Sequence, residues 1–379
     1  MNFIQEFEKM RPYIDSEVED AINRIVKKEE FKNILSFLYE NENRNDVIEM
    51  FKSIKTISSF QSKFSHYAVR EIVRKTSAGL STSGLEKLDN SKPYLFIANH
   101  RDIVLDSAIM QMLLVEYKHK TSQITFGSNL MFGEFVIDLG KLNKMFTFYR
   151  GGSKIQMYKN AVLHSEYIRH VISNEKESIW IAQRDGRTKD GNDKTQVALI
   201  KMLVMGKKDF LTAIRELYIV PVTISYEYEP CDALKVQELI LSKSGEYKKQ
   251  KNEDINSVLR GIKDYKGKIH MTFGTPINNF LEELPVAGIS KNELIDIIIQ
   301  EINNQTYKNY EIWPRNYIAY DIFTTSNKYF KIKYSQEQKN DFMDYVNSKI
   351  STIKGDKSEL KNMFTQMYAM PLINFNKTQ

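Results

Sequence analysis

Cysteine is almost absent from this sequence, which excludes several kinds of site. Of the 379 residues only Cys231 is a cysteine. A single thiol cannot form an internal disulfide, a cysteine-rich zinc site or an iron–sulfur cluster. Cys231 lies in the segment EPCD, and we interpret it as a packing residue.

Long apolar runs are also missing. The longest stretch without a charged residue, Asn362 to Asn376, has 15 residues and contains Pro371, whereas a spanning helix needs about 20 apolar residues. The first residues, MNFIQEFEKMRP, lack the basic and then apolar plan of a signal peptide. We therefore expect a cytosolic chain without a membrane-spanning segment.

The chain has little excess charge. Its 54 Lys and Arg against 48 Asp and Glu leave a net charge of +6, which is too dilute for the concentrated basic surface of a nucleic-acid-binding protein. A mild preference for anionic small molecules or anionic lipid stays open.

Several common motifs are absent, namely GxSxG, GxxxxGK[ST], GxGxxG and HExxH. Serine hydrolase, P-loop, dinucleotide-binding and zinc-protease functions therefore have no local support. Asp185, Asp190 and Asp193 lie near two glycines, but their spacing lacks the alternate ligands and terminal glutamate of a calcium loop. We expect no metal site.

Three regions follow from the pattern of apolar residues. Helical spacing before residue 89 predicts a helical N-terminal domain, 1–88, ending in a small, polar linker, Thr76 to Gly84. In 89–284 short apolar runs alternate with amphipathic stretches, which predicts an α/β domain with a mixed, mostly parallel sheet flanked by helices. Residues 285–379 return to a helical pattern. The runs predicted as strands are 94–98, 123–127, 145–149, 178–182, 217–224 and 268–273.

The stretch YLFIANHRDIVLDSAIM is the richest in chemistry. An apolar strand runs directly into His100, Arg101 and Asp102, and a helix begins near Asp106. A histidine at a strand exit suits a general base, and a nearby carboxylate can orient its ring. The competing interpretation is that His100 and Asp102 only cap the helix.

This stretch resembles the His-Asp block of the glycerolipid acyltransferase superfamily. The family has four residues between the two, and this chain has five between His100 and Asp106. Asp102 is the alternative partner, but the helix SAIMQMLL matches the family's continuation and favours Asp106.

Further blocks follow in the family's order. The Phe-Gly-x-Pro turn of Phe273, Gly274 and Pro276 makes the chain most similar to the bacterial glycerol-3-phosphate acyltransferase branch. LNKMFTFYRGG carries Arg150, which the resemblance assigns to the substrate phosphate. IWIAQRDGRTKDG resembles the acid-Gly-Arg element, and LYIVPVTISYEYEP resembles the closing strand. The substrate-binding residues that the resemblance implies are Arg150, Asp185, Gly186, Arg187, Lys189 and Pro221.

The resemblance implies an O-acyltransferase of phospholipid synthesis that uses no cofactor. His100, oriented by Asp106, would activate the hydroxyl of glycerol-3-phosphate for attack on a thioester of acyl carrier protein or coenzyme A. Lysophosphatidate or another lipid precursor is the alternative acceptor, and a non-catalytic lipid-binding protein is the alternative from another class. Neither the donor nor the oligomeric state follows from the sequence.

We also expect peripheral association with the inner face of the cell membrane. The stretch Tyr307 to Tyr334 combines nine aromatic and five basic residues with only two acidic ones, a composition that suits an anionic interface. Two alternatives are that these aromatics pack the C-terminal helices, and that the stretch belongs to a nucleic-acid or adaptor module; scattered aromatics on helices argue against the latter.

Overall fold

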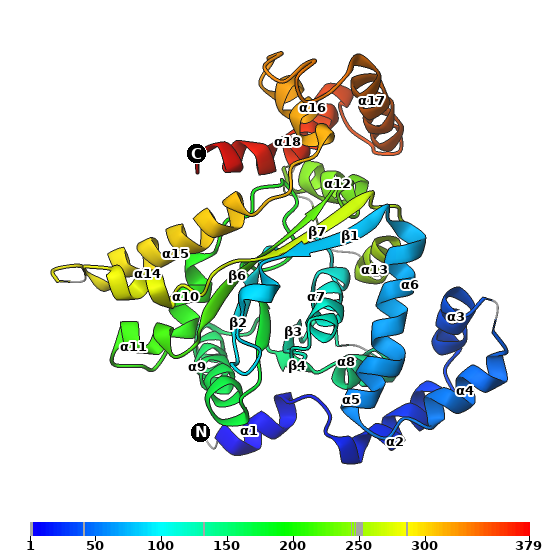
Figure 1. Ribbon diagram of the computed structural model, residues 1–379, viewed down its shortest axis with the longest axis vertical. Helices are drawn as coiled ribbons and strands as arrows, with labels where there is room; N and C mark the ends of the chain where they lie inside the picture. Colours follow the sequence, from blue (N-terminus) through cyan, green and yellow to red (C-terminus); the bar gives the residue numbers. More distant parts are fainter. Residues whose placement is uncertain are drawn as a thin grey trace.

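A mixed seven-stranded sheet forms the centre of the molecule (Figure 1). The computed structural model describes residues 3–40, 42–131, 133–243, 245, 247, 253–285 and 287–379. The strand order is β1-β7-β6-β2-β5-β3-β4. Strands β2 to β6 run parallel to one another, and β7 lies antiparallel to β6 and parallel to β1. The strands are β1 (Gly79–Ser83), β2 (Leu95–Ala98), β3 (Gln123–Gly127), β4 (Met145–Phe148), β5 (Ile179–Ala182), β6 (Ile219–Tyr226) and β7 (Lys268–Phe273).

Six of these strands are the apolar runs predicted from the sequence. Residues of β2, β5 and β6 are buried on both faces of the sheet, so β2 and β5 are continuously apolar and β6 adds only the buried Thr223 and Ser225. The predicted linker is wrong, because Gly79–Ser83 is strand β1 and pairs with β7. Its sequence, GLSTS, is small and polar because β1 lies at the edge of the sheet.

Helices cover both faces of the sheet and form two apolar cores. One core joins β2, β4, β5 and β6 to helices on the first face. The other joins β2, β3, β5, β6 and β7 to helices on the second face. The first set is α1 (Phe3–Met10), α9 (Lys154–His170), η3 (Val171–Glu175), α10 (Val197–Leu203), α11 (Phe210–Arg215), α14 (Asn278–Glu283) and α15 (Lys291–Lys308), and the second is α6 (His66–Thr76), η2 (Leu85–Lys87) and α7 (Leu105–Glu116).

The two ends of the chain add helical layers with cores of their own. The N-terminal core includes Leu142 from the α/β part, and the C-terminal core includes Ala233 and Val236. Packing therefore continues across the predicted boundaries at residues 88 and 284. These helices are α2 (Asp15–Ile25), α3 (Glu29–Leu38), α4 (Arg44–Lys52), α5 (Ile57–Phe60), η1 (Gln61–Ser65), α8 (Glu134–Leu142), α12 (Asp232–Lys243), α16 (Pro314–Phe323), α17 (Gln336–Ser351) and α18 (Lys357–Asn376). Helix α13 (Glu253–Lys263) belongs to neither core and contacts α6.

The aromatics between Tyr307 and Tyr334 do not form an exposed surface. Four of them are buried, at 4 to 9% exposure, and the others are half-buried against the C-terminal core. The structure thus favours the packing interpretation of this stretch. Among the described residues, the helices are too short or too polar to cross a membrane.

Candidate active site

The carboxyl ends of four neighbouring parallel strands bring the predicted blocks to one edge of the sheet. His100 follows β2, Arg150 follows β4, and Asp185 to Lys189 follow β5. This edge is where binding groups collect in open α/β sheets, because each loop there leaves a strand whose position is fixed by its neighbours.

His100 and Asp106 form a hydrogen-bonded pair. His100 Nδ1 lies 2.9 Å from Asp106 Oδ2. The same carboxylate oxygen accepts the backbone N–H groups of Arg101, at 2.6 Å, and Asp102, at 2.9 Å. Because Nδ1 faces a carboxylate, we assign the proton of the neutral ring to Nδ1, which leaves the lone pair of Nε2 free to accept a proton.

Tyr226 holds the second oxygen of the Asp106 carboxylate. The Tyr226 hydroxyl, at the end of β6, donates to Asp106 Oδ1 at 2.9 Å. Burial and the charge of Asp106 raise the pKa of Tyr226 far above its usual value, so the phenol keeps its proton. Tyr226 was part of the closing-strand motif, but the sequence did not show this contact.

Asp102 helps to cap α7 from two residues before its N-cap residue, Val104. Its Oδ1 accepts the backbone N–H groups of Val104, at 2.9 Å, and Leu105, at 2.8 Å. Burial, and then the charge of Asp106, raise the pKa of Asp102. The cap interpretation therefore holds for Asp102, whereas His100 is bonded to Asp106.

Trp180 of β5 supports the His100 ring. The two rings meet edge to face, with centroids 5.5 Å apart. Trp180 is 4% exposed and packs in the core of the α7 side. The sequence of β5 did not predict this contact. The contact depends on the pairing of β5 with β2, which the sequence of one strand does not specify.

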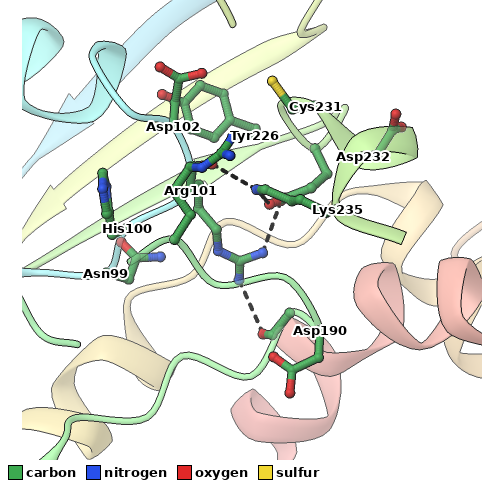
Figure 2. Close-up of polar contacts among 12 residues, drawn as sticks. Asn99, His100, Arg101, Asp102, Asp190, Tyr226, Cys231, Asp232 and Lys235 are labelled. Carbon is green, nitrogen blue, oxygen red and sulfur yellow. Dashed lines mark hydrogen bonds and ion pairs between the residues drawn. The ribbon is translucent and has the colours of Figure 1, made fainter. Parts of the chain in front are cut away.

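Arg101 lies in a buried ionic network behind the pair. Its guanidinium bonds to Asp193, at 2.5 Å and 3.0 Å, and to Glu229, at 2.9 Å. Lys235 pairs with Glu229 and donates to the Arg101 carbonyl oxygen at 2.7 Å. Figure 2 shows this network extending from Arg101 toward Lys235 and the loop of Asp190, with His100 to one side. Arg101, which with Asp102 is a secondary site candidate from the sequence, thus has buried structural partners.

The loop 183–196 contacts both His100 and Arg150. Its Thr188 N–H donates to the carbonyl oxygen of His100 at 2.7 Å. Its Asp185 forms an ion pair with Arg150, and the two side chains are 69% and 39% exposed. Gly186, with φ of +71°, makes the turn between these contacts. Asp185 and Arg150 were both predicted to bind substrate, and here they bind each other.

Arg187 and Lys189 take partners on other helices. Arg187 Nη2 donates to Ser257 of α13 at 3.3 Å, and Lys189 pairs with Glu238 of α12. Within the described part of the chain, none of the bonded contacts joins either residue to Arg150. Arg187 and Lys189 thus each have a partner outside the loop, and their contact with the substrate phosphate stays a prediction.

Pro221 is buried inside the sheet and opposes Ile97 of β2. Strand β6 is central, whereas proline in a strand is usually confined to an edge or a bulge. The ladder to β7 begins one residue later, at Val222, and the Pro221 oxygen accepts from the Gly274 N–H at 2.8 Å. Proline has no N–H group to donate, and Pro221 lies beyond the last residue pair of that ladder.

His164 fixes the loop that carries Arg150. Its Nε2 accepts the backbone N–H of Tyr149 at 3.0 Å, and its ring stacks on Phe148 with centroids 3.8 Å apart. Burial, together with the charge of Arg150, lowers the pKa of His164 to about 3. The ring is therefore neutral and acts as an acceptor.

The C-terminal helix α18 presses on the other end of the loop 183–196. A Cβ at Gly191 would lie 2.2 Å from the carbonyl oxygen of Met367, so the backbones approach as closely as glycine allows. Asn374 donates to Asn192 at 3.2 Å. The C-terminal region therefore helps to shape the loop that contacts both His100 and Arg150.

Cys231 and the acidic residues show no sign of a metal centre. Cys231 is buried and its thiol lies 3.3 Å from the Ser257 carbonyl oxygen, and burial raises its pKa. In the part of the chain that the structure describes, no group of three or more His, Cys, Asp or Glu side chains is placed to hold a metal ion.

Three comparisons with known proteins show what this chain is similar to. The chain is similar to the 1-acyl-sn-glycerophosphate (LPA) acyltransferase PlsC from Thermotoga maritima, with 13% identity over 75% of this chain and 91% of that chain and a TM-score of 0.37. A search of curated proteins finds no match. Residues 79–227 match the family model named Acyltransferase, a segment that begins at β1 and ends just after β6. The part of the chain that carries His100, Asp106, Arg150 and the loop 183–196 is thus the part that matches an acyltransferase family, which supports an acyltransferase activity.

Proposed function

We propose that this protein is a lipid O-acyltransferase of the glycerolipid acyltransferase superfamily. The observation that carries the proposal is the pair of His100 and Asp106 at the sheet edge that also holds Arg150, with no hydrogen bond from the described residues to His100 Nε2. The acyltransferase family match over the same residues supports it.

In the proposed reaction His100 is the general base. Nε2 takes the proton of the acceptor hydroxyl as its oxygen attacks the thioester carbonyl, and Asp106 stabilises the imidazolium that forms. The carbon–sulfur bond then breaks, and the thiolate recovers the proton from His100. General-base help of this kind is worth ~10² to 10⁴ in rate. Three donors hold Asp106, so the ring orientation is set before substrate binds.

Arg150 is the proposed contact for the acceptor phosphate. A guanidinium offers a planar fork of N–H donors that suits phosphate oxygens. Because Arg150 is paired with Asp185, the phosphate must share or replace that partner. Gly127 leaves the space that Arg150 uses, since a Cβ there would lie 3.0 Å from Arg150 Nε. Asp185, which follows β5, thus holds Arg150, which follows β4, across the end of β3.

Glycerol-3-phosphate is the proposed acceptor, with acyl carrier protein or coenzyme A as donor. Lysophosphatidate has the same phosphate and a free hydroxyl, and the half-exposed position of Arg150 leaves room for a longer acceptor. The lipid product must enter a bilayer, and we therefore propose peripheral binding to the membrane.

Acyl-transfer assays test the proposal. Purified protein is offered each donor with glycerol-3-phosphate and with lysophosphatidate, and product is measured. His100→Ala and Asp106→Asn are expected to abolish transfer. His170→Ala is the matched control, because His170 also pairs with a carboxylate, that of Glu175, but lies at the far end of α9. Full activity of His100→Ala would exclude the general-base role.

Arg150→Ala separates phosphate binding from catalysis. A lost charged hydrogen bond costs about 1.5 to 3 kcal/mol, so the KM for the acceptor is expected to rise about tenfold to a hundredfold while the KM for the donor stays constant. Should the wild type bind acceptor but transfer no acyl group with any donor, the rival function of a non-catalytic lipid-binding protein would be favoured.

A further inference from the structure

An exposed apolar segment begins directly after Arg150. We name residues 151–159 the α9 rim, and every one of them is exposed. Ile155, Met157 and Tyr158 are 70%, 49% and 60% exposed. Large apolar side chains rarely gather at the surface without a partner. From Asn160 onward the same helix is anchored by buried side chains, including Leu163 and His164.

The topology places the α9 rim beside the candidate active site. Helix α9 connects β4 to β5, and both of these strands pair in parallel with β3. A crossover helix between parallel strands starts at their carboxyl edge, so α9 starts at the edge that holds Arg150 and His100. Gly151, with φ of +76°, turns the chain outward, and nothing lies within 4 Å of a Cβ placed there.

The α9 rim is basic as well as apolar. Lys154 and Lys159 flank the three apolar side chains, and the sequence has no acidic residue between Asp138 and Glu166. Neither lysine forms an ion pair with a carboxylate of the described residues. Apolar side chains between unpaired cations suit the boundary between the hydrocarbon and the anionic headgroups of a bilayer, where lysine stems extend to the headgroups.

We propose that the α9 rim binds the surface of an anionic lipid bilayer. Ile155, Met157 and Tyr158 enter the interface, and Lys154 and Lys159 contact lipid phosphates. This orientation turns the carboxyl edge of the sheet toward the membrane, so a lipid leaves the site without crossing water. The release of a lipid from the site rests on the proposed function, whereas the binding of the α9 rim to the bilayer does not.

Vesicle flotation tests the proposal with the full-length protein. The probes are vesicles of equimolar phosphatidylglycerol and phosphatidylcholine, and vesicles of phosphatidylcholine alone, at low and high salt. We expect the wild type to float with the anionic vesicles and to be released by salt. Ile155→Glu should weaken this binding at least about tenfold, because an apolar contact is lost and a like charge is added. Lys154→Glu with Lys159→Glu should remove the part that depends on salt.

Ile332→Glu is the matched control. Ile332 is 74% exposed and stands between Lys331 and Lys333 in the C-terminal region, so it has the same residue type, a similar exposure and the same flanking charge. This variant should float like the wild type. Equal loss in both variants, or flotation of Ile155→Glu at the wild-type level, would overturn the assignment.

Two more outcomes are decisive. Wild-type protein that never floats, but whose binding to an acidic acyl carrier protein is lost in the Lys154 and Lys159 variant, would identify the α9 rim as a protein-binding surface and overturn the proposal. Flotation needs no turnover, so an inactive protein that still floats would count against the proposed function alone. Activity of Ile155→Glu on a water-soluble acceptor should equal that of the wild type.

Discussion

The Tyr226 hydroxyl and His100 bind opposite oxygens of the Asp106 carboxylate, each at 2.9 Å. Tyr226 thereby acts on His100 through a third residue, and we regard it as a positioning residue. Because Asp106 is 1% exposed, this hydrogen bond meets little competition from water.

Tyr226→Phe should lower kcat by about tenfold or more, since a hydrogen bond to a charged group is worth about 1.5 to 3 kcal/mol. The KM for the acceptor should stay constant. The acid limb of the kcat/KM profile should move to higher pH, because the imidazolium then faces a carboxylate with one hydrogen bond fewer. Steady-state kinetics across pH measure both effects.

Tyr334→Phe is the control for that variant. Tyr334 is buried and donates to Asp321 at 2.8 Å, but it lies in the C-terminal region. It should lose stability without a change in the pH profile. A Tyr226→Phe profile that coincides with the wild type would reduce Tyr226 to a structural residue.

Asp102→Asn should keep most of the activity and stabilise the protein at neutral pH. Burial raises the pKa of Asp102 above 3.8, so wild-type stability falls as pH rises from 3.8 through the folded-state value. Asparagine keeps the cap through its side-chain oxygen and has no charge to bury. Denaturant unfolding at pH 4 and at pH 7 should show that the gain is present only at the higher pH. Loss of activity equal to that of Asp106→Asn would instead make Asp102 the partner of His100.

His164 should make the protein less stable in mild acid. Its pKa is about 3 in the folded state, against 6.5 for the free side chain, so the unfolded state binds the extra proton between these values. Stability should therefore fall by about 1.4 kcal/mol per pH unit below pH 6.5 through this group. His164→Gln, which retains an acceptor for the Tyr149 N–H, should remove that contribution. Parallel unfolding curves at pH 7, 6 and 5 compare the slopes, and equal slopes would contradict the assignment.

Gly191→Ala should disrupt the loop 183–196 and reduce transfer. The new methyl group would lie 2.2 Å from the Met367 carbonyl oxygen, and φ is +78°. The matched variant Gly151→Ala has nearly the same φ, +76°, but open space around it. Both variants bear the backbone strain of a positive φ. Only Gly191→Ala should also lose stability through overpacking, which typically costs about 1 to 3 kcal/mol. Thermal unfolding of the two variants measures the difference, and equal destabilisation would show that α18 yields at that point.

The sequence located the strands well where burial dictates composition. The predicted runs ending at Ala98, Ala182 and Ile224 are mostly apolar on both faces because helices cover both sides of the sheet. Strand β1 escaped prediction because an edge strand of Gly, Ser and Thr has no such requirement.

The candidate site was predictable only as far as local spacing reaches. His100 and Asp106 lie on adjoining elements, so their contact follows from a strand exit and one helical turn. The partners of Arg187 and Lys189 lie on α13 and α12, which are inserted between β6 and β7. The direction of those two side chains depends on the packing of that insertion, which the loop sequence does not specify.

The contact between α18 and the loop 183–196 has a consequence for how the protein folds. Asn192 and Asn374 are 182 positions apart. Tyr368 of α18, whose hydroxyl donates to Asp232, is 136 positions from Asp232. During synthesis the loop emerges long before the helix that presses on Gly191, so the sheet can form while that side of the loop is still uncovered. Closing so long a chain segment carries an entropic cost and slows folding. The His100 edge should therefore reach its final shape in a late step, when the C-terminal helices dock.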